Sequence, residues 1–170
     1  ETTKRNIWAL GDALGRYMFR HTANYESRIV AINALTDRKY PADYHAVPHA
    51  VFGYPQVASV GLTQAQAQAM KYDILVGIAR YTDVTKGYAM AEEGLVKVIV
   101  EAETNKILGC HIVGAEAATL VQQIVYLMNA GHQDYFPIAD SQIIHPALSE
   151  VIIEAFANLA PPGHVHHYRA

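Results

Sequence analysis

A histidine and a glutamate lie five positions apart in the sequence His145-Pro146-Ala147-Leu148-Ser149-Glu150. Proline is favoured at the first position of a helix, so we expect a helix from about Pro146 to Leu159 with His145 just before it. Helical side chains lean toward the N-terminus, which brings Glu150 back to the His145 ring. A carboxylate on one ring nitrogen fixes the tautomer and stabilises the imidazolium. Such a pair corresponds to the base and the orienting carboxylate of a catalytic triad, without the nucleophile. The alternative is that His145 is a loop histidine that caps a helix.

A glycine followed by an aspartate is the second candidate for chemistry. Residues 6–12 are predicted to form a short buried strand that ends at Gly11 and Asp12. Glycine at a strand end lets the backbone approach a ligand, and the neighbouring carboxylate can accept a hydrogen bond from a sugar or ribityl hydroxyl. An ordinary turn is the alternative, because Gly-Asp is common turn chemistry.

The elements that position these residues change in kind along the chain. A helix is expected over 21–35, with Ala23, Ser27, Val30, Ala31 and Ala34 on its apolar stripe and Glu26 off it. A polar stretch at 37–43 marks a domain boundary.

After this boundary the pattern changes to short strands. They are expected at 50–53, 56–61 and 73–81, with a helix at 64–70 that begins with a capping box from Thr63 to Gln66. A hairpin is expected from 95–102 and 107–113. Longer helices follow at 115–130 and 146–159. Strands followed by helices favour an α+β domain, an antiparallel sheet with flanking helices, preceded by a strand-helix segment.

The composition limits the class of protein. Half of the 170 residues are apolar and 17% are charged, which is typical of a globular protein with a buried core. A formal net charge of -3 gives no basic surface for nucleic acid, and no apolar run approaches the length of a membrane helix. With a single cysteine, Cys110, we expect a reducing, cytoplasmic setting and a buried thiol that acts as a small hydrophobe.

Three segments, in this order, resemble the flavoprotein pyridine-nucleotide disulfide oxidoreductases. Residues 8–12 with His21, Ala23 and Glu26 resemble the second FAD-binding segment of that family. Residues 48–63 resemble the opening of its dimerisation domain, and residues 145–150 resemble its active-site motif. The resemblance implies that residues 1–44 are the C-terminal segment of an FAD-binding domain and that residues 45–170 form the dimerisation domain.

The resemblance also implies roles for single residues. Asp12 beside Gly11 would bind the FAD ribityl chain, and the backbone near Met18 and Phe19 would meet the flavin ring. His21 would lie near the flavin, or else on the polar surface of the helix. The family is homodimeric, uses NADH or NADPH, and acts on a small thiol or disulfide. In it the residue matching His145 is the acid-base for a dithiol held by the other subunit, with Glu150 as its partner.

Residues 17–26, 81–84 and 87–90 are most similar to the mycothione reductase branch, with dihydrolipoamide dehydrogenase as the near alternative. Mercuric reductase is disfavoured, because its C-terminal cysteine pair is missing. The substrate and the choice between NADH and NADPH remain open.

Two parts of the family pattern are missing from these 170 residues: a Gly-x-Gly-x-x-Gly fingerprint and a Cys-x-x-x-x-Cys pair. The sequence starts at Glu1 without an initiator methionine, so we expect a piece of a longer polypeptide that alone neither binds FAD tightly nor turns over. The alternative is a stand-alone dimerisation module without catalysis. Three tail histidines, His164, His166 and His167, have no spacing that enforces metal geometry, and we expect a solvated tail and no metal site.

Overall fold

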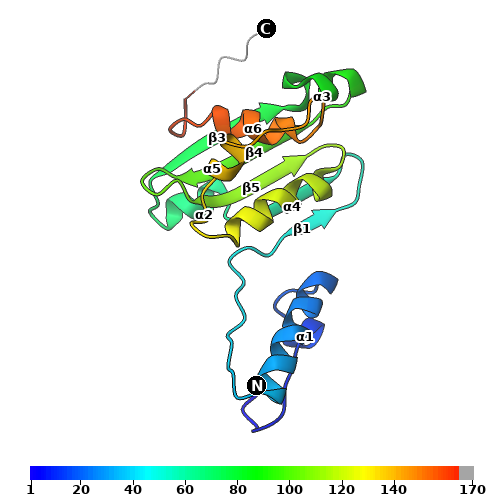
Figure 1. Cartoon of the computed structure of the whole chain (residues 1–170), viewed down its shortest axis with the longest axis vertical. Helices are drawn as coiled ribbons and strands as arrows, with labels where there is room; N and C mark the ends of the chain where they lie inside the picture. Colours follow the sequence, from blue (N-terminus) through cyan, green and yellow to red (C-terminus); the bar gives the residue numbers. More distant parts are fainter. Residues whose placement is uncertain (165–170) are drawn as a thin grey trace. The chain divides into compact units, whose positions relative to one another are not determined.

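The computed structural model describes residues 1–164, which divide into two compact units. The first unit is Glu1–Val47 and the second begins at Pro48. The regular structure of the first unit is helical, and the second unit contains the sheet (Figure 1).

The first unit consists of a 3-10 turn, η1 (Gly11–Leu14), and one long helix, α1 (Arg20–Leu35). The strand predicted for residues 6–12 is wrong: residues 7–10 have no regular structure, and η1 begins at Gly11. A strand is stabilised by hydrogen bonds to a neighbouring strand. Residues 1–47 contain no second strand that could supply them.

The buried face of α1 is polar, contrary to the apolar stripe predicted for it. The helix buries Thr22, Glu26 and Asn33, whereas Ser27 and Ala31 are exposed. Polar side chains can be buried when hydrogen bonds satisfy them. Glu26 accepts hydrogen bonds from the Gly11 backbone N–H and from the Tyr44 hydroxyl, and these contacts place it on the inner face.

The second unit is built on an antiparallel sheet of five strands, as the sequence predicted. The strands are β1 (His49–Val51), β2 (Val57–Gly61), β3 (Ile74–Arg80), β4 (Leu95–Glu101) and β5 (Ile107–Val113). Their order across the sheet is β1-β2-β5-β4-β3. The predicted hairpin is the β4–β5 pair, in which Val98 lies opposite Cys110.

Two helices pack against this sheet and close the core (Figure 1). Helix α4 (Ala117–Met128) packs against β5 and β2, and helix α6 (Glu150–Ala157) packs against β3 and β4. Shorter helices lie in the connections: α2 (Gln64–Ala69), η2 (Tyr81–Asp83) and α3 (Thr85–Met90) between strands, and α5 (Phe136–Ala139) between α4 and α6. The capping box predicted for Thr63 and Gln66 is present at the start of α2. No helix within residues 1–164 is long and apolar enough to cross a membrane.

Candidate active site

The His145 ring is hydrogen-bonded to the Glu150 carboxylate. Nδ1 of His145 lies 2.7 Å from Oε1 of Glu150. The other oxygen, Oε2, accepts a hydrogen bond from the Ala147 backbone N–H at 2.8 Å. The carboxylate is therefore fixed by two partners, and its contact with Nδ1 leaves Nε2 as the ring nitrogen available for exchange.

The chain between these two residues is a tight turn and not the start of a helix. We predicted a helix from Pro146, but α6 begins at Glu150. The peptide His145–Pro146 is cis, and the N–H groups of Glu150 and Val151 bond to the carbonyls of Ala147 and Leu148, three residues earlier. The His145 ring lies against the first residue of α6 through its contact with Glu150. The contact expected from the sequence is formed, by a different local geometry.

The pKa of Glu150 lies below its usual value. The hydrogen bond from the Ala147 N–H is the main cause, and the hydrogen bond to His145 adds to it. Both interactions favour the charged carboxylate over the neutral acid. At neutral pH the site therefore contains a carboxylate that can stabilise an imidazolium on His145.

The pair is open to a second molecule. The His145 side chain is 63% exposed, whereas that of Glu150 is 21% exposed. An exposed ring held by a sheltered carboxylate can exchange a proton with an external group. The chain's own cysteine is not that group, because Cys110 is fully buried in β5 and burial raises the pKa of its thiol to about 12. This bears out the expected packing of Cys110 as a small core residue.

The Gly11–Asp12 turn begins η1, and its geometry is held from inside the first unit. Gly11 has a left-handed backbone with φ of 67°, and its N–H donates to the Glu26 carboxylate. A Cβ at Gly11 would lie 3.3 Å from Cβ of Ala23, so only a residue without a side chain packs here easily. Asp12, by contrast, is exposed. The prediction missed Glu26 as a support for this turn; its place five residues after His21 gave no direct signal of burial.

The other predicted cofactor contacts lie at the start of α1. Phe19 is the N-cap residue, Met18 before it is 71% exposed, and the Phe19 and His21 rings stack at 5.2 Å. The Thr22 hydroxyl is buried and has no hydrogen-bond partner among the described residues. A close-packed glycine, an exposed carboxylate and a buried hydroxyl without a partner fit one edge of a large polar cofactor. The phosphate-binding fingerprint that such a cofactor site needs is missing from the 170 residues.

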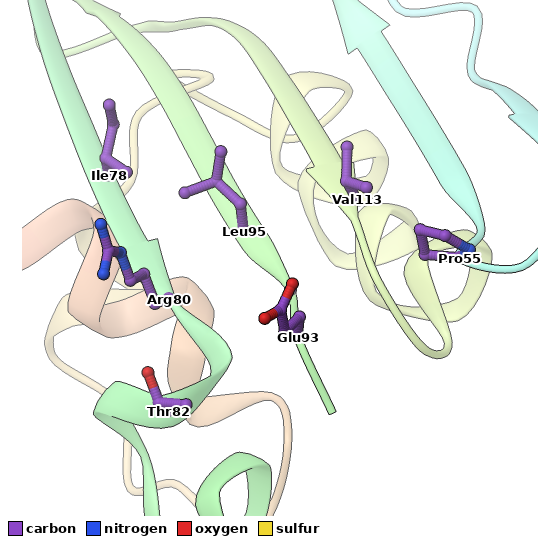
Figure 2. Close-up of a pocket in the computed structure, with 8 residues that line it drawn as sticks. Pro55, Ile78, Arg80, Thr82, Glu93, Leu95 and Val113 are labelled. Atoms are coloured by element: carbon purple, nitrogen blue, oxygen red, sulfur yellow. The ribbon is translucent and has the colours of Figure 1, made fainter. Parts of the chain in front are cut away.

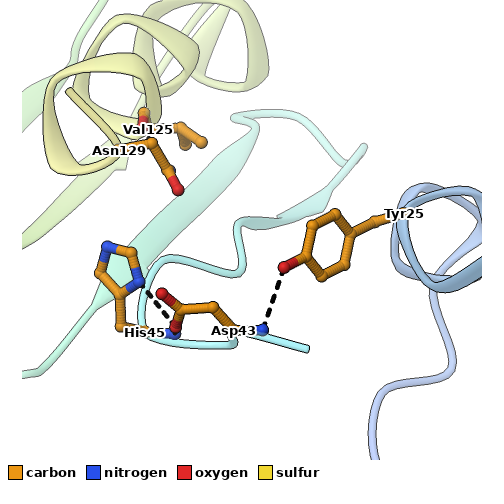
Figure 3. Close-up of polar contacts among 5 residues, drawn as sticks. All are labelled: Tyr25, Asp43, His45, Val125 and Asn129. Carbon is orange, nitrogen blue, oxygen red and sulfur yellow. Dashed lines mark hydrogen bonds and ion pairs between the residues drawn. The ribbon is translucent and has the colours of Figure 1, made fainter. Parts of the chain in front are cut away.

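The segment after α1 is also held by polar contacts (Figure 3). The Tyr25 hydroxyl accepts a hydrogen bond from the Asp43 N–H at 3.0 Å, and the Asp43 carboxylate lies 2.9 Å from Nδ1 of His45. The hydrogen bonds from the backbone and ring of His45 lower the pKa of Asp43. Tyr44 donates to Glu26, and burial together with this bond raises the pKa of Tyr44.

A hollow on the second unit was not expected from the sequence (Figure 2). Its volume is about 690 Å³, and its lining residues are Pro55, Ile78, Arg80, Thr82, Glu93, Gly94, Leu95 and Val113. Leu95 and Val113 lie opposite each other in the β4–β5 pair, and both contribute to the apolar part of the lining.

No group of three or more His, Cys, Asp or Glu side chains in residues 1–164 is arranged to hold a metal ion. Of the three tail histidines, His166 and His167 lie outside the described residues.

Comparison with protein families gives one match. The model of the pyridine nucleotide-disulphide oxidoreductase dimerisation domain matches residues 47–156. These residues include the whole five-stranded sheet and the His145–Glu150 pair.

Individual relatives extend the likeness into the first unit. Mycothione reductase of Mycobacterium tuberculosis is 40% identical over 164 residues, covering 93% of this chain and 36% of the relative. Dihydrolipoyl dehydrogenase of Synechocystis is 35% identical over 156 residues, covering 89% of this chain and 32% of the relative. Among solved structures, the HOCl-induced flavoprotein disulfide reductase RclA from Escherichia coli matches with a TM-score of 0.82 at 29% identity, over 91% of this chain and 36% of that one. The chain thus spans about a third of the length of these proteins.

Proposed function

Because the chain belongs to the pyridine nucleotide-disulphide oxidoreductase family through its dimerisation domain, we propose that it supplies the His–Glu acid-base pair and the dimer interface of an FAD-dependent disulfide or dithiol oxidoreductase. The contact between His145 and Glu150 is the observation that carries this proposal. Residues 1–44 are, in this proposal, the end of the flavin domain, and residues 45–170 form the dimerisation domain.

His145 moves one proton in the proposed reaction. Its Nε2 takes the proton from the S–H group of a small thiol, which leaves a thiolate and an imidazolium. In the opposite direction the imidazolium returns the proton to a thiolate that leaves a disulfide. Glu150 keeps the proton of the neutral ring on Nδ1 and stabilises the positive charge that develops. The dithiol lies outside these 170 residues, which contain only one cysteine, Cys110. In this proposal it belongs to the second subunit of a homodimer.

FAD and either NADH or NADPH are the proposed cofactor and co-substrate. When bound, the flavin would supply two-electron redox chemistry between the nicotinamide and the disulfide form of the dithiol. This chain would hold one edge of the flavin cofactor, with Asp12 at the ribityl chain, the backbone of Met18 and Phe19 near the ring, and His21 beside them. The left-handed backbone of Gly11 and the buried Thr22 hydroxyl support this assignment.

The substrate proposed first is the disulfide of mycothiol. The 40% identity to a mycothione reductase over almost the whole chain supports it. Lipoamide is the second candidate, because a dihydrolipoyl dehydrogenase is 35% identical. We also propose a cytoplasmic location, which agrees with a lone buried cysteine.

A stand-alone dimerisation module is the alternative function. It is favoured by one observation, the lack of a glycine fingerprint and of a cysteine pair in the 170 residues. A module of this kind has no use for an exposed His145 held by Glu150, and for that reason we prefer the enzyme.

The proposal is tested on the longest polypeptide that the gene encodes. Oxidation of NADH and NADPH is followed with mycothiol disulfide and with lipoamide, for the natural protein and for His145→Gln. We expect the variant to lose turnover on the order of 10²-fold or more, as for loss of a general acid-base, while its FAD content and dimer mass stay unchanged. His132→Gln is the matched control, because His132 is exposed and belongs to the same unit. Equal activity of the two variants, or a polypeptide that forms dimers without binding FAD, would rule out the enzyme.

A further inference from the structure

The Glu26 carboxylate joins two segments that lie on either side of α1 in the sequence. One of its oxygens accepts a hydrogen bond from the Gly11 N–H, which precedes the helix by nine residues. The other accepts a hydrogen bond at 2.8 Å from the Tyr44 hydroxyl, which follows the helix. Glu26 is only 4% exposed, so water does not readily replace either partner.

The backbone that Glu26 holds is the unusual part of the turn. Gly11 has φ of 67°, and its N–H is buried with the glycine. A buried N–H without an acceptor is costly, and in this unit Glu26 provides the acceptor. Because Asp12 follows directly in the chain, the backbone at Gly11 sets the direction in which the Asp12 side chain leaves the turn.

The Tyr44 ring is held in place by three neighbouring side chains. Its ring stacks on Tyr17 at 5.4 Å and meets the edge of Tyr25 at 6.5 Å. The guanidinium of Arg16 lies 4.2 Å from the ring centroid, a cation–π contact. Glu26 is thus bonded to a rigid aromatic cluster on one side and to the glycine turn on the other.

We propose that Glu26 is a positioning residue for the flavin site: it fixes the backbone of Gly11 and thereby the Asp12 carboxylate, using Tyr44 as its anchor. This inference rests on the proposed function, because it concerns the edge of the cofactor that Asp12 would bind. In this proposal Glu26 acts through the turn and does not itself bind the cofactor.

Asn33 offers a matched control on the same helix. Its side chain is also buried on the inner face of α1, and it also holds the segment after the helix, by two hydrogen bonds with the backbone of Tyr40. Neither hydrogen bond involves the Gly11–Asp12 turn. Asn33→Ala therefore removes two partly buried hydrogen bonds from the first unit and leaves the contacts of the proposed cofactor turn unchanged.

The experiment measures FAD affinity on the full-length polypeptide after removal of the flavin, by quenching of flavin fluorescence, together with urea unfolding of each apo-protein. We expect Glu26→Ala to raise the Kd for FAD about tenfold or more above that of Asn33→Ala at comparable stability, because an unsatisfied buried N–H loosens the turn. Glu26→Gln should stay within about threefold of the natural protein, since an amide can accept from Gly11 and donate to the Tyr44 oxygen.

Glu26→Asp serves if the alanine variant does not fold, because the shorter carboxylate cannot reach both partners and should also weaken FAD binding. Equal Kd values for the Asn33→Ala variant and for the folded Glu26 variants would overturn the inference while leaving the flavin site in place. A natural full-length protein that does not bind FAD at all would instead remove the proposed function.

Discussion

Oε1 of Glu150 lies 2.7 Å from Nδ1 of His145, although the side chains come from opposite ends of a turn. The contact fixes the tautomer of the ring, so its loss should impair proton transfer more than binding. We expect Glu150→Ala in the full-length protein to lower kcat on the order of 10²-fold, with a smaller change in KM. Steady-state assays check this against Glu154→Ala, which removes an exposed carboxylate from the same helix. A kcat equal to that of the Glu154 variant would show that Glu150 has no part in the reaction.

The lowered pKa of Glu150 predicts how stability depends on acid. A carboxyl group whose pKa is lower in the folded state stabilises the fold above the unfolded value of 4.5, and the contribution is lost as pH falls below that value. Glu150→Gln should therefore be less stable than the natural chain at pH 7, and the difference should shrink toward pH 3. Urea unfolding at both pH values measures it. A difference that stays constant with pH would mean that the charge of Glu150 does not matter to stability.

Local sequence patterns predicted the strands and helices of the second unit. They could not predict contacts between residues that are far apart in the sequence. The Thr63–Gln66 capping box and the β4–β5 hairpin depend on neighbours in sequence, and both were found. The burial of Glu26 was missed because its partners lie 15 and 18 residues away. The start of α6 was placed four residues early, because the position of Pro146 favours a helix and the turn that replaces it depends on Glu150 and Ala147.

His111 on β5 should make the second unit sensitive to mild acid. Its Nδ1 lies 3.0 Å from the Ser59 hydroxyl and its Nε2 lies 3.1 Å from the Leu62 carbonyl, which can only accept. The neutral ring with its proton on Nε2 satisfies both partners. Burial lowers the pKa of His111 below 6.5, and the nearby charges of Lys97 and His49 act in the same direction.

The unfolded chain therefore binds more protons than the folded chain as pH falls through 6.5, and His111 costs stability there. We expect the free energy of unfolding to fall between pH 7 and pH 5 more steeply in the natural chain than in His111→Asn. Urea titrations across this range test the slope. Parallel pH dependence in the two proteins would contradict the prediction.

The packing of the Tyr81 ring against Gly94 predicts that position 94 cannot accommodate a side chain. The Tyr81 ring is fully buried, and its hydroxyl donates to the Ala115 carbonyl at 2.7 Å. A Cβ at Gly94 would overlap Cγ of this ring, which has no room to move. We expect Gly94→Ala to destabilise the fold by roughly 1–3 kcal/mol, the range for an overpacked core. Gly53→Ala is the control for urea unfolding, since its Cβ would make an ordinary contact 3.6 Å from the Pro55 carbonyl oxygen. A matching loss in both variants would show that the ring has no special role.

Cys110 should be inert in the folded protein. Its side chain, on β5, is fully buried, and burial raises the pKa of the thiol to about 12. The thiolate is the form that reacts with an alkylating reagent. At pH 8 the Cys110 thiol is both inaccessible and protonated, so it should not react. We expect iodoacetamide to label Cys110 at pH 8 only after unfolding in urea, with mass spectrometry as the readout. Rapid labelling of the folded chain would place a reactive thiol within this unit, and the dithiol of the proposed reaction would no longer have to come entirely from elsewhere.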